Sequence, residues 1–219
     1  MAEYQKRQIT RDEYAGFDGA YEWFNKQLFD SQLPPCLITL QRKAHSHGYF
    51  ANDRFGHRTD AEDRTDELAL NPDTFVGRSD KDILSTLVHE MCHGWQQHFG
   101  KPSRTGYHNR QWAAKMIEVG LMPSDTGLEG GKQTGQHMTH DMVAGGAFDR
   151  AADALLATGF QLNWQSAAWS ARSRPKGKNK VKYTCPTCGQ NAWAKPEASL
   201  VCGDCQEAME AQASLDPMA

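Results

Sequence analysis

The sequence predicts an α+β fold, and three observations favour this class. Residues 10–28 carry large apolar side chains at three- and four-residue steps, which is the spacing of one face of a helix. Short apolar runs at 37–40, 48–51 and 67–71 are separated by polar segments and indicate strands. Two further helical patterns follow. The expected order is therefore a helix, a small sheet, and then two helices that carry the chemistry.

The first helix is expected to begin at Thr10, because Thr10 and Glu13 have the spacing of a capping box. Its apolar face predicts core packing, and Pro34-Pro35 is expected to end it. The stretch 52–66, with eight charged residues, is interpreted as a solvated loop between strands. The apolar face of the first helix consists of Tyr14, Phe17, Tyr21, Phe24 and Leu28.

The second helix is predicted over about twenty residues. Ser79 and Asp82 form a capping box before the apolar run Ile83-Leu84-x-x-Leu87-Val88, and Gly100-x-Pro102 marks a stop. Inside this helix lies His89-Glu90-Met91-Cys92-His93. This is the His-Glu-x-x-His pattern of a zinc hydrolase helix.

The spacing explains the chemistry. Four residues turn a helix by roughly 400°, so His89 and His93 lie one above the other and both reach one ion. Glu90 lies about 100° round the helix from His89. It can contact a water at the metal without binding the metal, as a general base must.

A catalytic zinc needs a third protein ligand and an open position for water. Cys92 and His98 point in other directions on the same helix, so the ligand must come from elsewhere in the chain. His108 is expected to open the next amphipathic helix, and a side chain at that first turn can fold back toward the metal; the alternative is that His108 caps the start of that helix. Tyr107 and Arg110 beside it are candidate oxyanion stabilisers.

The C-terminal part has a different composition. Residues 171–182 hold six basic side chains and no acidic one, so that 171–205 carries a net charge of +5 whereas 1–170 carries −5. A cationic arm of this kind is a candidate nucleic-acid contact, together with the aromatic ring of Trp193. The six are Arg172, Arg174, Lys176, Lys178, Lys180 and Lys182.

Four of the six cysteines form two Cys-x-x-Cys pairs, Cys185 with Cys188 and Cys202 with Cys205. Four thiolates at this spacing predict a closed, structural zinc site. A segment of roughly 25 residues buries little core, so the metal is expected to provide its folding free energy. A redox dithiol pair is the alternative.

With these motifs in order, the chain resembles the SprT-like family, whose eukaryotic relatives include the Spartan proteases. The resemblance implies a minimal zincin-like metalloprotease domain that binds zinc through His89, His93 and His108, uses Glu90 as its base, and cleaves proteins on DNA. The expected domains are a protease domain over 10–122, a basic linker over 171–182 and a Cys₄ zinc ribbon over 183–206. The segment 123–170 departs from the family pattern; its residues predict a helix near Phe148 to Phe160, and it is expected to be a helical extension to which the resemblance assigns no role. The matching motifs are Ala20-Tyr21-x-x-Phe24-Asn25, Leu33-Pro34, Gly48-Tyr49-Phe50, Leu68-Ala69-Leu70-Asn71-Pro72, His89 to Trp95, His108-x-x-x-Trp112 and the ribbon.

Two other functions stay open from the sequence. One is a DNA-binding regulator or adaptor that keeps the zinc fold without cleaving, against which the intact Glu90 argues. The other is a metal hydrolase of another bond, such as a deformylase, but Cys36 lacks the context of a cysteine ligand. His45, His47 and His57 have no second element of fixed spacing and are interpreted as surface histidines with a possible substrate or nucleic-acid contact.

The expected cofactors are two zinc ions per chain, one catalytic and one structural. The expected partners are protein substrates and DNA, single-stranded or containing junctions. No apolar run approaches the roughly 18 residues of a membrane helix, and the N-terminus lacks a signal segment. A location in the cytoplasm, on the nucleoid or in the nucleus, without membrane association, is therefore expected.

Overall fold

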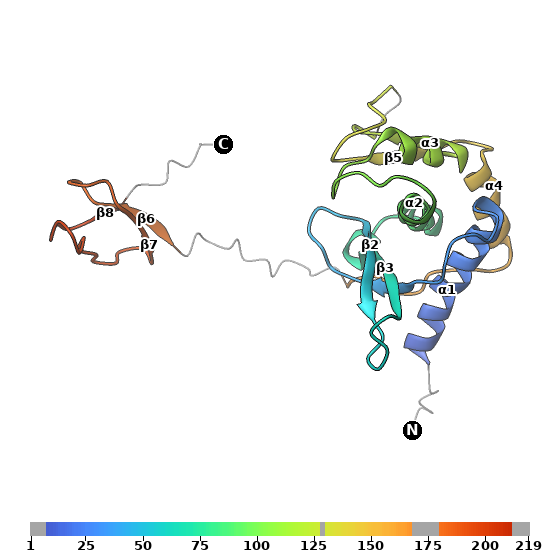
Figure 1. Ribbon diagram of the computed structural model, residues 1–219, viewed down its shortest axis with the longest axis horizontal. Helices are drawn as coiled ribbons and strands as arrows, with labels where there is room; N and C mark the ends of the chain where they lie inside the picture. Colours follow the sequence, from blue (N-terminus) through green and yellow to red (C-terminus); the bar gives the residue numbers. More distant parts are fainter. Residues whose placement is uncertain (1–7, 128–129, 168–179, 212–219) are drawn as a thin grey trace. The chain divides into compact units, whose positions relative to one another are not determined.

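The computed structural model describes residues 8–127, 130–167 and 180–211. The chain divides into two compact units, Met1–Ala168 and Trp169–Ala219. The first unit mixes helices with small sheets, and the second is a small three-stranded sheet. The α+β prediction is confirmed (Figure 1).

Helix α1 (Ile9–Leu28) packs its aromatic face into the core, where Phe17 and Phe24 are fully buried. Its start differs from the prediction. The N-cap is Gln8, whose side chain makes no capping hydrogen bond, so Thr10 lies inside the helix. Glu13 is buried instead of capping. Tyr14, at the edge of the predicted face, is exposed.

The first sheet has the order β1-β3-β2. Strand β1 (Leu37–Leu40) runs parallel to β3 (Arg64–Leu70), and β2 (Gly48–Gly56) runs antiparallel to β3. Central strand β3 carries Leu68 and Leu70 into the core. Strand β2 lies at an edge of this sheet.

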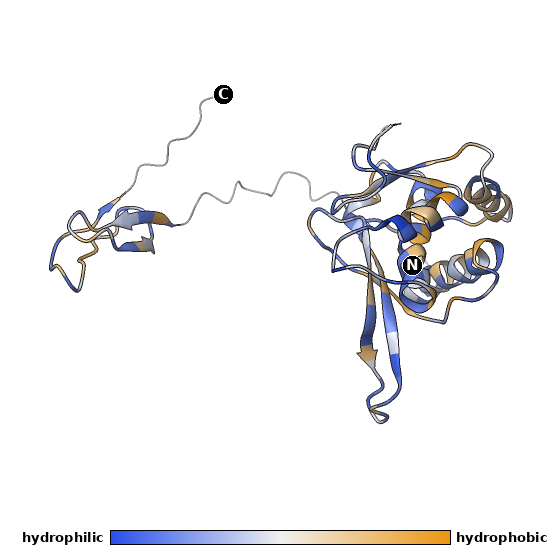
Figure 2. Cartoon of the chain, turned by 45° about the horizontal axis from the view of Figure 1, so that its top comes forward, coloured by the Kyte–Doolittle hydropathy of each residue, from blue (hydrophilic) through white to orange (hydrophobic). Residues whose placement is uncertain are grey.

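The interpretation of 52–66 as a loop was wrong. Strands β2 and β3 continue into this stretch as a hairpin that projects from the body and is largely hydrophilic toward its tip (Figures 1 and 2). Only 57–63 connects the two strands. Asp66 on β3 is buried; its Oδ2 lies 2.7 Å from His98 Nε2, and its Oδ1 accepts from the Asp53 N–H at 2.9 Å. His98 therefore binds a carboxylate and is occupied away from the metal, as its position on the helix predicted.

Helix α2 (Asp80–Phe99) crosses the centre of the unit, between the sheet on one side and α3 on the other (Figure 1). The predicted capping box is present: Ser79 Oγ accepts from the Asp82 N–H, and Asp82 accepts from the Ser79 N–H. Gly100 is the C-cap. Because elements cover α2 on several sides, twelve of its twenty residues are buried.

A short 3₁₀ turn, Pro72–Thr74, precedes α2. Helix α3 (Arg110–Glu118) follows α2 after a loop. Asn109 is the N-cap of α3 and accepts from the backbone of Gln111 and Trp112. His108 thus lies just outside the helix. Trp112 and Met116 of α3 are fully buried against α2 in the common core.

The description of 123–170 as a helical extension was incomplete. The segment opens with an antiparallel pair, β4 (Leu121–Ser124) with β5 (Thr139–Met142), and continues as helix α4 (Ala147–Ala157). The predicted helix near Phe148 is confirmed. Phe148 is fully buried and stacks on Phe24 of α1, with ring centroids 5.6 Å apart. These elements therefore complete the core of the first unit.

The second unit contains strands β6 (Val181–Thr184), β7 (Asn191–Ala194) and β8 (Glu210–Ala211) in the order β7-β6-β8. Its buried side chains are Tyr183, Cys185 and Cys202. Tyr183 Oη donates to the Lys195 carbonyl at 3.0 Å. With so small a core, this unit needs another source of folding free energy.

Candidate metal centres

Two helical histidines and one loop histidine converge in the first unit. His89 and His93 come from α2, and His108 comes from the segment before α3. One ring nitrogen from each lies within 4.8 Å of the others. Zinc–nitrogen bonds of roughly 2.1 Å at tetrahedral angles place ligand nitrogens about 3.4 Å apart, so the three residues fit one zinc ion and leave a fourth position open.

The surroundings keep these imidazoles neutral, which is the form that binds a metal. Burial lowers the pKa of His93 to about 3, and the nearby His108 adds to the effect. Burial, followed by the charge of His140, lowers the pKa of His89 well below its usual value. Burial is also the main cause of the lowered pKa of His108.

His108 is held by backbone bonds to a distant segment. Its N–H donates to the Gly135 carbonyl at 2.8 Å, and the Gly135 N–H donates back at 3.1 Å. His108 Nδ1 lies 3.2 Å from the same carbonyl. If Nδ1 carries the proton and donates there, Nε2 is left with its lone pair for the metal.

Asn109 fixes the neighbouring backbone. Its Oδ1 accepts from Gln96 Nε2 at 2.6 Å and from two N–H groups of α3, while its Nδ2 donates to the Lys101 carbonyl at 3.1 Å. Gln96 lies on α2, three residues after His93. One side chain therefore joins the helix that carries two ligands to the segment that carries the third.

Trp112 forms the wall behind the ligands. It is fully buried, and its ring centroid lies 4.9 Å from that of His89, 5.3 Å from that of His93 and 4.3 Å from that of His108. This packing limits the rotation of all three imidazoles. Cys92, also on α2, belongs to the hydrophobic core.

Glu90 is buried beside the three histidines. Burial raises the pKa of Glu90 to about 8, whereas the Lys43 charge and the Phe50 backbone N–H act in the opposite direction. A cation bound by the histidines also favours the carboxylate form, because opposite charges attract. Glu90 thus lines the same cleft as the three histidines without belonging to their cluster.

A cleft of about 1100 Å³ opens at this centre, and His89, Glu90, His93 and His108 all line it. One wall comes from residues 41–46 and 48–52, which include the first part of edge strand β2, and another from residues 102–108. Lys43 Nζ lies 4.6 Å from the ring centroid of Tyr49, and Arg104 Cζ lies 5.3 Å from that of Tyr107. The cleft walls therefore present cations from two separate loops.

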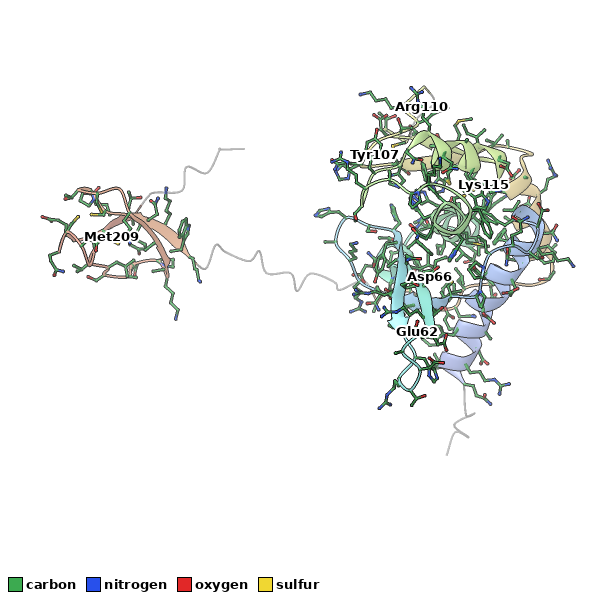
Figure 3. The ribbon with its side chains drawn as sticks, viewed as in Figure 1. Glu62, Asp66, Tyr107, Arg110, Lys115 and Met209 are labelled. Atoms are coloured by element: carbon green, nitrogen blue, oxygen red, sulfur yellow. The ribbon has the colours of Figure 1, made fainter. Side chains whose placement is uncertain are left out.

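The two candidate oxyanion stabilisers differ in placement (Figure 3). Tyr107 lines the cleft. Arg110, in the first turn of α3, is exposed and is not among the lining residues. Tyr107 is thus the better placed of the two for a role in substrate binding.

The other histidines have separate positions. His45 lines the cleft, and His57 is exposed on the hairpin, where the Thr59 N–H donates to its Nδ1 at 3.4 Å. His47 Nδ1 lies 3.4 Å from Arg78. Burial, followed by the Arg78 charge, lowers the pKa of His47. Cys36 is not a lining residue of the cleft, which removes the basis for a cysteine ligand.

Sequence reasoning missed His140. His140 lies on β5; its Nδ1 lies 3.1 Å from His89 Nδ1, and its Nε2 lies 2.9 Å from Ser85 Oγ. Burial, followed by the charges of Arg78 and His47, lowers the pKa of His140 to about 4. No motif links residue 140 to residue 89, and only the pairing of β5 with β4 brings them together.

The four cysteines of the second unit also converge, with all four sulfurs within 4.8 Å of one another. Cys188 Sγ and Cys202 Sγ are 3.7 Å apart. Four zinc–sulfur bonds of about 2.3 Å at tetrahedral angles require a sulfur spacing of about 3.8 Å, so the cluster fits a zinc ion. The backbone N–H of Cys188, and then that of Thr187, lowers the pKa of Cys185 to about 7.

Both cysteine pairs lie on turns of the same shape. Gly189 donates to the Cys185 carbonyl at 3.0 Å, and Gln206 donates to the Cys202 carbonyl at 2.8 Å. Each of these residues has positive φ, 74° and 56°. The cluster with its two turns is consistent with a zinc ribbon.

The predicted nucleic-acid residues are only partly described. Arg172, Arg174, Lys176 and Lys178 lie outside the described residues. Lys182 on β6 is paired with Trp193 on β7, so their side chains lie on the same face of the sheet. Trp193 is 61% exposed. Lys180 is exposed just before β6.

These sites define the first unit as a fold with the metal-binding helix of zinc hydrolases, and the second as a Cys₄ cluster module. Comparison with known proteins gives the family. Residues 18–134 match the SprT-like family, and the chain belongs to it. The predicted resemblance is confirmed.

One curated relative is a Salmonella typhimurium protein described as "Uncharacterized protein in mucB 3'region". It is 48% identical over 46 residues, which make up 21% of this chain and 62% of the relative. The chain thus spans about six tenths of the length of that relative. No solved structure matches the chain. Among the described residues, no helix is long and apolar enough to cross a membrane.

Proposed function

We propose that the protein is a zinc-dependent metalloprotease that acts on proteins bound or crosslinked to DNA. The observation that carries the proteolytic part is the placement of Glu90 beside three converging histidines in an open cleft. A fold that kept this metal only for stability would need no carboxylate there. Membership of the SprT-like family supports the same conclusion.

The residues divide the chemistry among them. His89, His93 and His108 would hold the zinc ion. When bound by three histidines, zinc lowers the pKa of a coordinated water toward about 7 and polarises a carbonyl. Glu90 accepts the proton of the attacking water and returns it to the leaving amine. Tyr107, from the cleft wall, is placed to donate to the developing oxyanion.

Edge strand β2 and the loop of residues 102–108 shape the substrate site. The strand has backbone groups along its free side, and an extended peptide can hydrogen-bond to such an edge. The cleft's lysine and arginine side chains favour substrates with acidic residues near the cleaved bond. An open cleft of this size accepts a loop or an unfolded segment rather than a folded protein surface.

The DNA part of the proposal rests on the C-terminal unit and the arm before it. Lys182 and Trp193 lie side by side on one sheet face, and a cation beside an exposed ring suits a phosphate next to a stacked base. The six basic residues of 171–182 add phosphate contacts without base specificity. We place the DNA contact on this face and arm.

The test compares wild type with Glu90→Gln on a protein crosslinked to DNA, with and without added single-stranded DNA. We expect Glu90→Gln to keep both zinc ions and to lower cleavage at least about 10²-fold, as loss of a general base does. Wild type that binds DNA and zinc but cuts no protein would instead favour a non-proteolytic DNA-binding adaptor. His108→Ala should release the zinc of the histidine site.

A second test addresses the arm. Neutralising its six basic residues should weaken DNA binding and flatten its salt dependence by roughly 0.7 in log–log slope for each lost single-strand contact. Cleavage of a short unstructured peptide should stay nearly unchanged. Trp193→Ala should weaken binding by about 1–3 kcal/mol with little change in slope. Equal affinities of wild type and the six-fold variant at every salt concentration would remove DNA from the role of the arm.

A further inference from the structure

His140 is a buried histidine that the proposed chemistry does not use. It comes from β5, which among the described residues pairs with β4 alone, and it lies fifty-one residues after His89 in the chain. Its two ring nitrogens face two residues of α2: Nδ1 lies 3.1 Å from His89 Nδ1, and Nε2 lies 2.9 Å from Ser85 Oγ. Ser85 and His89 are four residues apart and therefore lie one turn apart on the same face of the helix.

The positions of the protons follow from these contacts. A neutral imidazole carries one ring proton, so a His89 that binds metal through Nε2 must carry its proton on Nδ1. That proton is donated to His140 Nδ1, which accepts it. His140 then carries its own proton on Nε2 and donates to Ser85 Oγ, and the Ser85 hydroxyl donates to the Asp82 carbonyl at 2.8 Å.

The opposite arrangement is unsuitable for a metal. If His140 donated from Nδ1, His89 would accept at its own Nδ1 and carry its proton on Nε2, the one ring nitrogen of His89 left for a metal. No lone pair would then be available for the ion. The chain of bonds from His89 to the Asp82 carbonyl therefore has one proton order that suits metal binding, and in that order every donor has an acceptor.

We propose that His140 is a positioning residue of the zinc centre: it accepts the Nδ1 proton of His89 and thereby fixes the tautomer and ring orientation of that ligand. The proposal rests on the zinc site of the proposed function, but it does not depend on proteolysis. Outer partners of this kind change metal affinity by about 10–100-fold when removed.

The segment that contains His140 also contacts a second ligand, His108. Gly135, five residues before His140, provides the carbonyl that lies 3.2 Å from His108 Nδ1. Residues 135–140 thus hold the outer nitrogens of two of the three ligands, one through a backbone carbonyl and the other through a side chain. Only the side-chain partner can be changed by substitution, which makes His140 the residue to test.

The experiment measures zinc binding to the full chain by competition with a chromophoric chelator, and His93→Ala identifies the zinc that belongs to the histidine site. His140→Leu removes the acceptor, and we expect it to weaken that zinc by about 10–100-fold. His140→Asn keeps an acceptor oxygen near the place of Nδ1 and should restore affinity to within about threefold of wild type. His57→Leu is the matched control, because His57 is an exposed histidine that is neither in the three-histidine cluster nor among the cleft-lining residues, and it should bind zinc as wild type does.

A second readout is the visible absorption of the Co²⁺-substituted protein, which reports the geometry of the ligand set. The spectrum of the histidine site should change in His140→Leu and return in His140→Asn. Equal loss of zinc in folded Leu and Asn variants, or wild-type affinity in both, would overturn the proposal. If His140→Leu does not fold, the comparison of His140→Asn with Ser85→Ala decides: we expect Ser85→Ala to weaken zinc more than His140→Asn, and the reverse order overturns the proposal.

The outcome is separate from that of the protease assay. A wild type that binds zinc at the histidine site, depends on His140, and cleaves nothing would contradict the proposed protease and support the positioning role. A wild type that binds zinc only through the cysteines would overturn both.

Discussion

Gly48 at the start of β2 lies directly against Glu90. A Cβ atom at Gly48 would be 3.2 Å from Glu90 Oε1 and 2.7 Å from the Ala69 carbonyl oxygen. The second distance is shorter than any real Cβ contact, and the neighbour is backbone that cannot rotate away. The absence of a side chain at residue 48 therefore lets the strand approach the carboxylate of α2.

Gly48→Ala should displace the strand or Glu90. We expect destabilisation by about 1–3 kcal/mol, the usual cost of overpacking, and a cleavage rate at least about tenfold lower, with both zinc ions retained. Thermal unfolding, metal analysis and the crosslink assay measure the three effects. Gly56→Ala on the same strand is the control, because nothing lies within 4 Å of its Cβ. Equal activity of the two variants would mean that this approach does not set the position of Glu90.

The hydrogen bonds of Asn109 to α2 and α3 should control how firmly His108 is held as the third ligand. Asn109→Ala removes a helix cap, which costs about 0.5–2 kcal/mol, and also frees the segment that carries His108 from Gln96. We expect faster release of zinc from the histidine site, measured by chelator kinetics. Ser79→Ala is the control: it also removes a helix cap, at the start of α2 and ten residues before His89, and it should release zinc at the wild-type rate. If Asn109→Ala also releases zinc at the wild-type rate, the hydrogen bonds of Asn109 do not control the binding of the third ligand.

We expect the chain to bind two zinc ions, and these ions should differ in lability. The histidine site has three protein ligands and lines an open cleft, whereas the cysteine site has four thiolates and no open position. Metal analysis after mild chelation should find about one zinc per chain, and Cys202→Ser should then leave less than one. Simultaneous loss of both ions from wild type would contradict this model.

The buried Glu13 should make stability depend on pH. Burial is the largest cause of its raised pKa; the backbone N–H groups of Asn163 and Trp164 lower it, and Asp80 raises it. Since the folded chain holds the proton more tightly than the unfolded chain, this residue makes stability fall as pH rises through the window above 4.5. Its Oε1 is buried without a hydrogen-bond partner among the described residues.

Glu13→Gln removes the charge and should therefore raise the melting temperature at pH 7.5 by at least about 2 °C, with the gain shrinking toward pH 4.5. Differential scanning calorimetry across this range measures it. Glu22→Gln, at an exposed position of the same helix, should show no such trend. A gain in Glu13→Gln that does not change with pH would point to packing instead of charge.

The predictions from sequence were strongest where the signal is local. The capping box at Ser79, the helical period through Leu87 and the pattern around His89 are all read within one element, and α2 has the predicted position. His108 was found because a loop and a helix start follow α2 directly. These motifs all lie within residues 18–134, the stretch that matches the SprT-like family.

Non-local pairing explains what was missed. The outer parts of β2 and β3 hold many charged residues because the hairpin projects from the body, so their pattern resembles a loop. Thr10 had the spacing of a cap, but the helix begins earlier, at Ile9. His140 has no nearby partner in sequence, and its contact with His89 depends on how β5 is placed by its pairing with β4.

The attachment of α4 sets a lower limit on the length of any fragment that keeps the histidine site. Trp23 Nε1 donates to the Ala151 carbonyl at 3.0 Å, and Phe148 covers Phe24, so a chain cut after residue 134 would expose an aromatic surface on α1. The same cut would remove Gly135 and His140 from the outer nitrogens of two ligands. We therefore expect a fragment that keeps the histidine site to extend at least to residue 157, beyond the residues 18–134 that match the family.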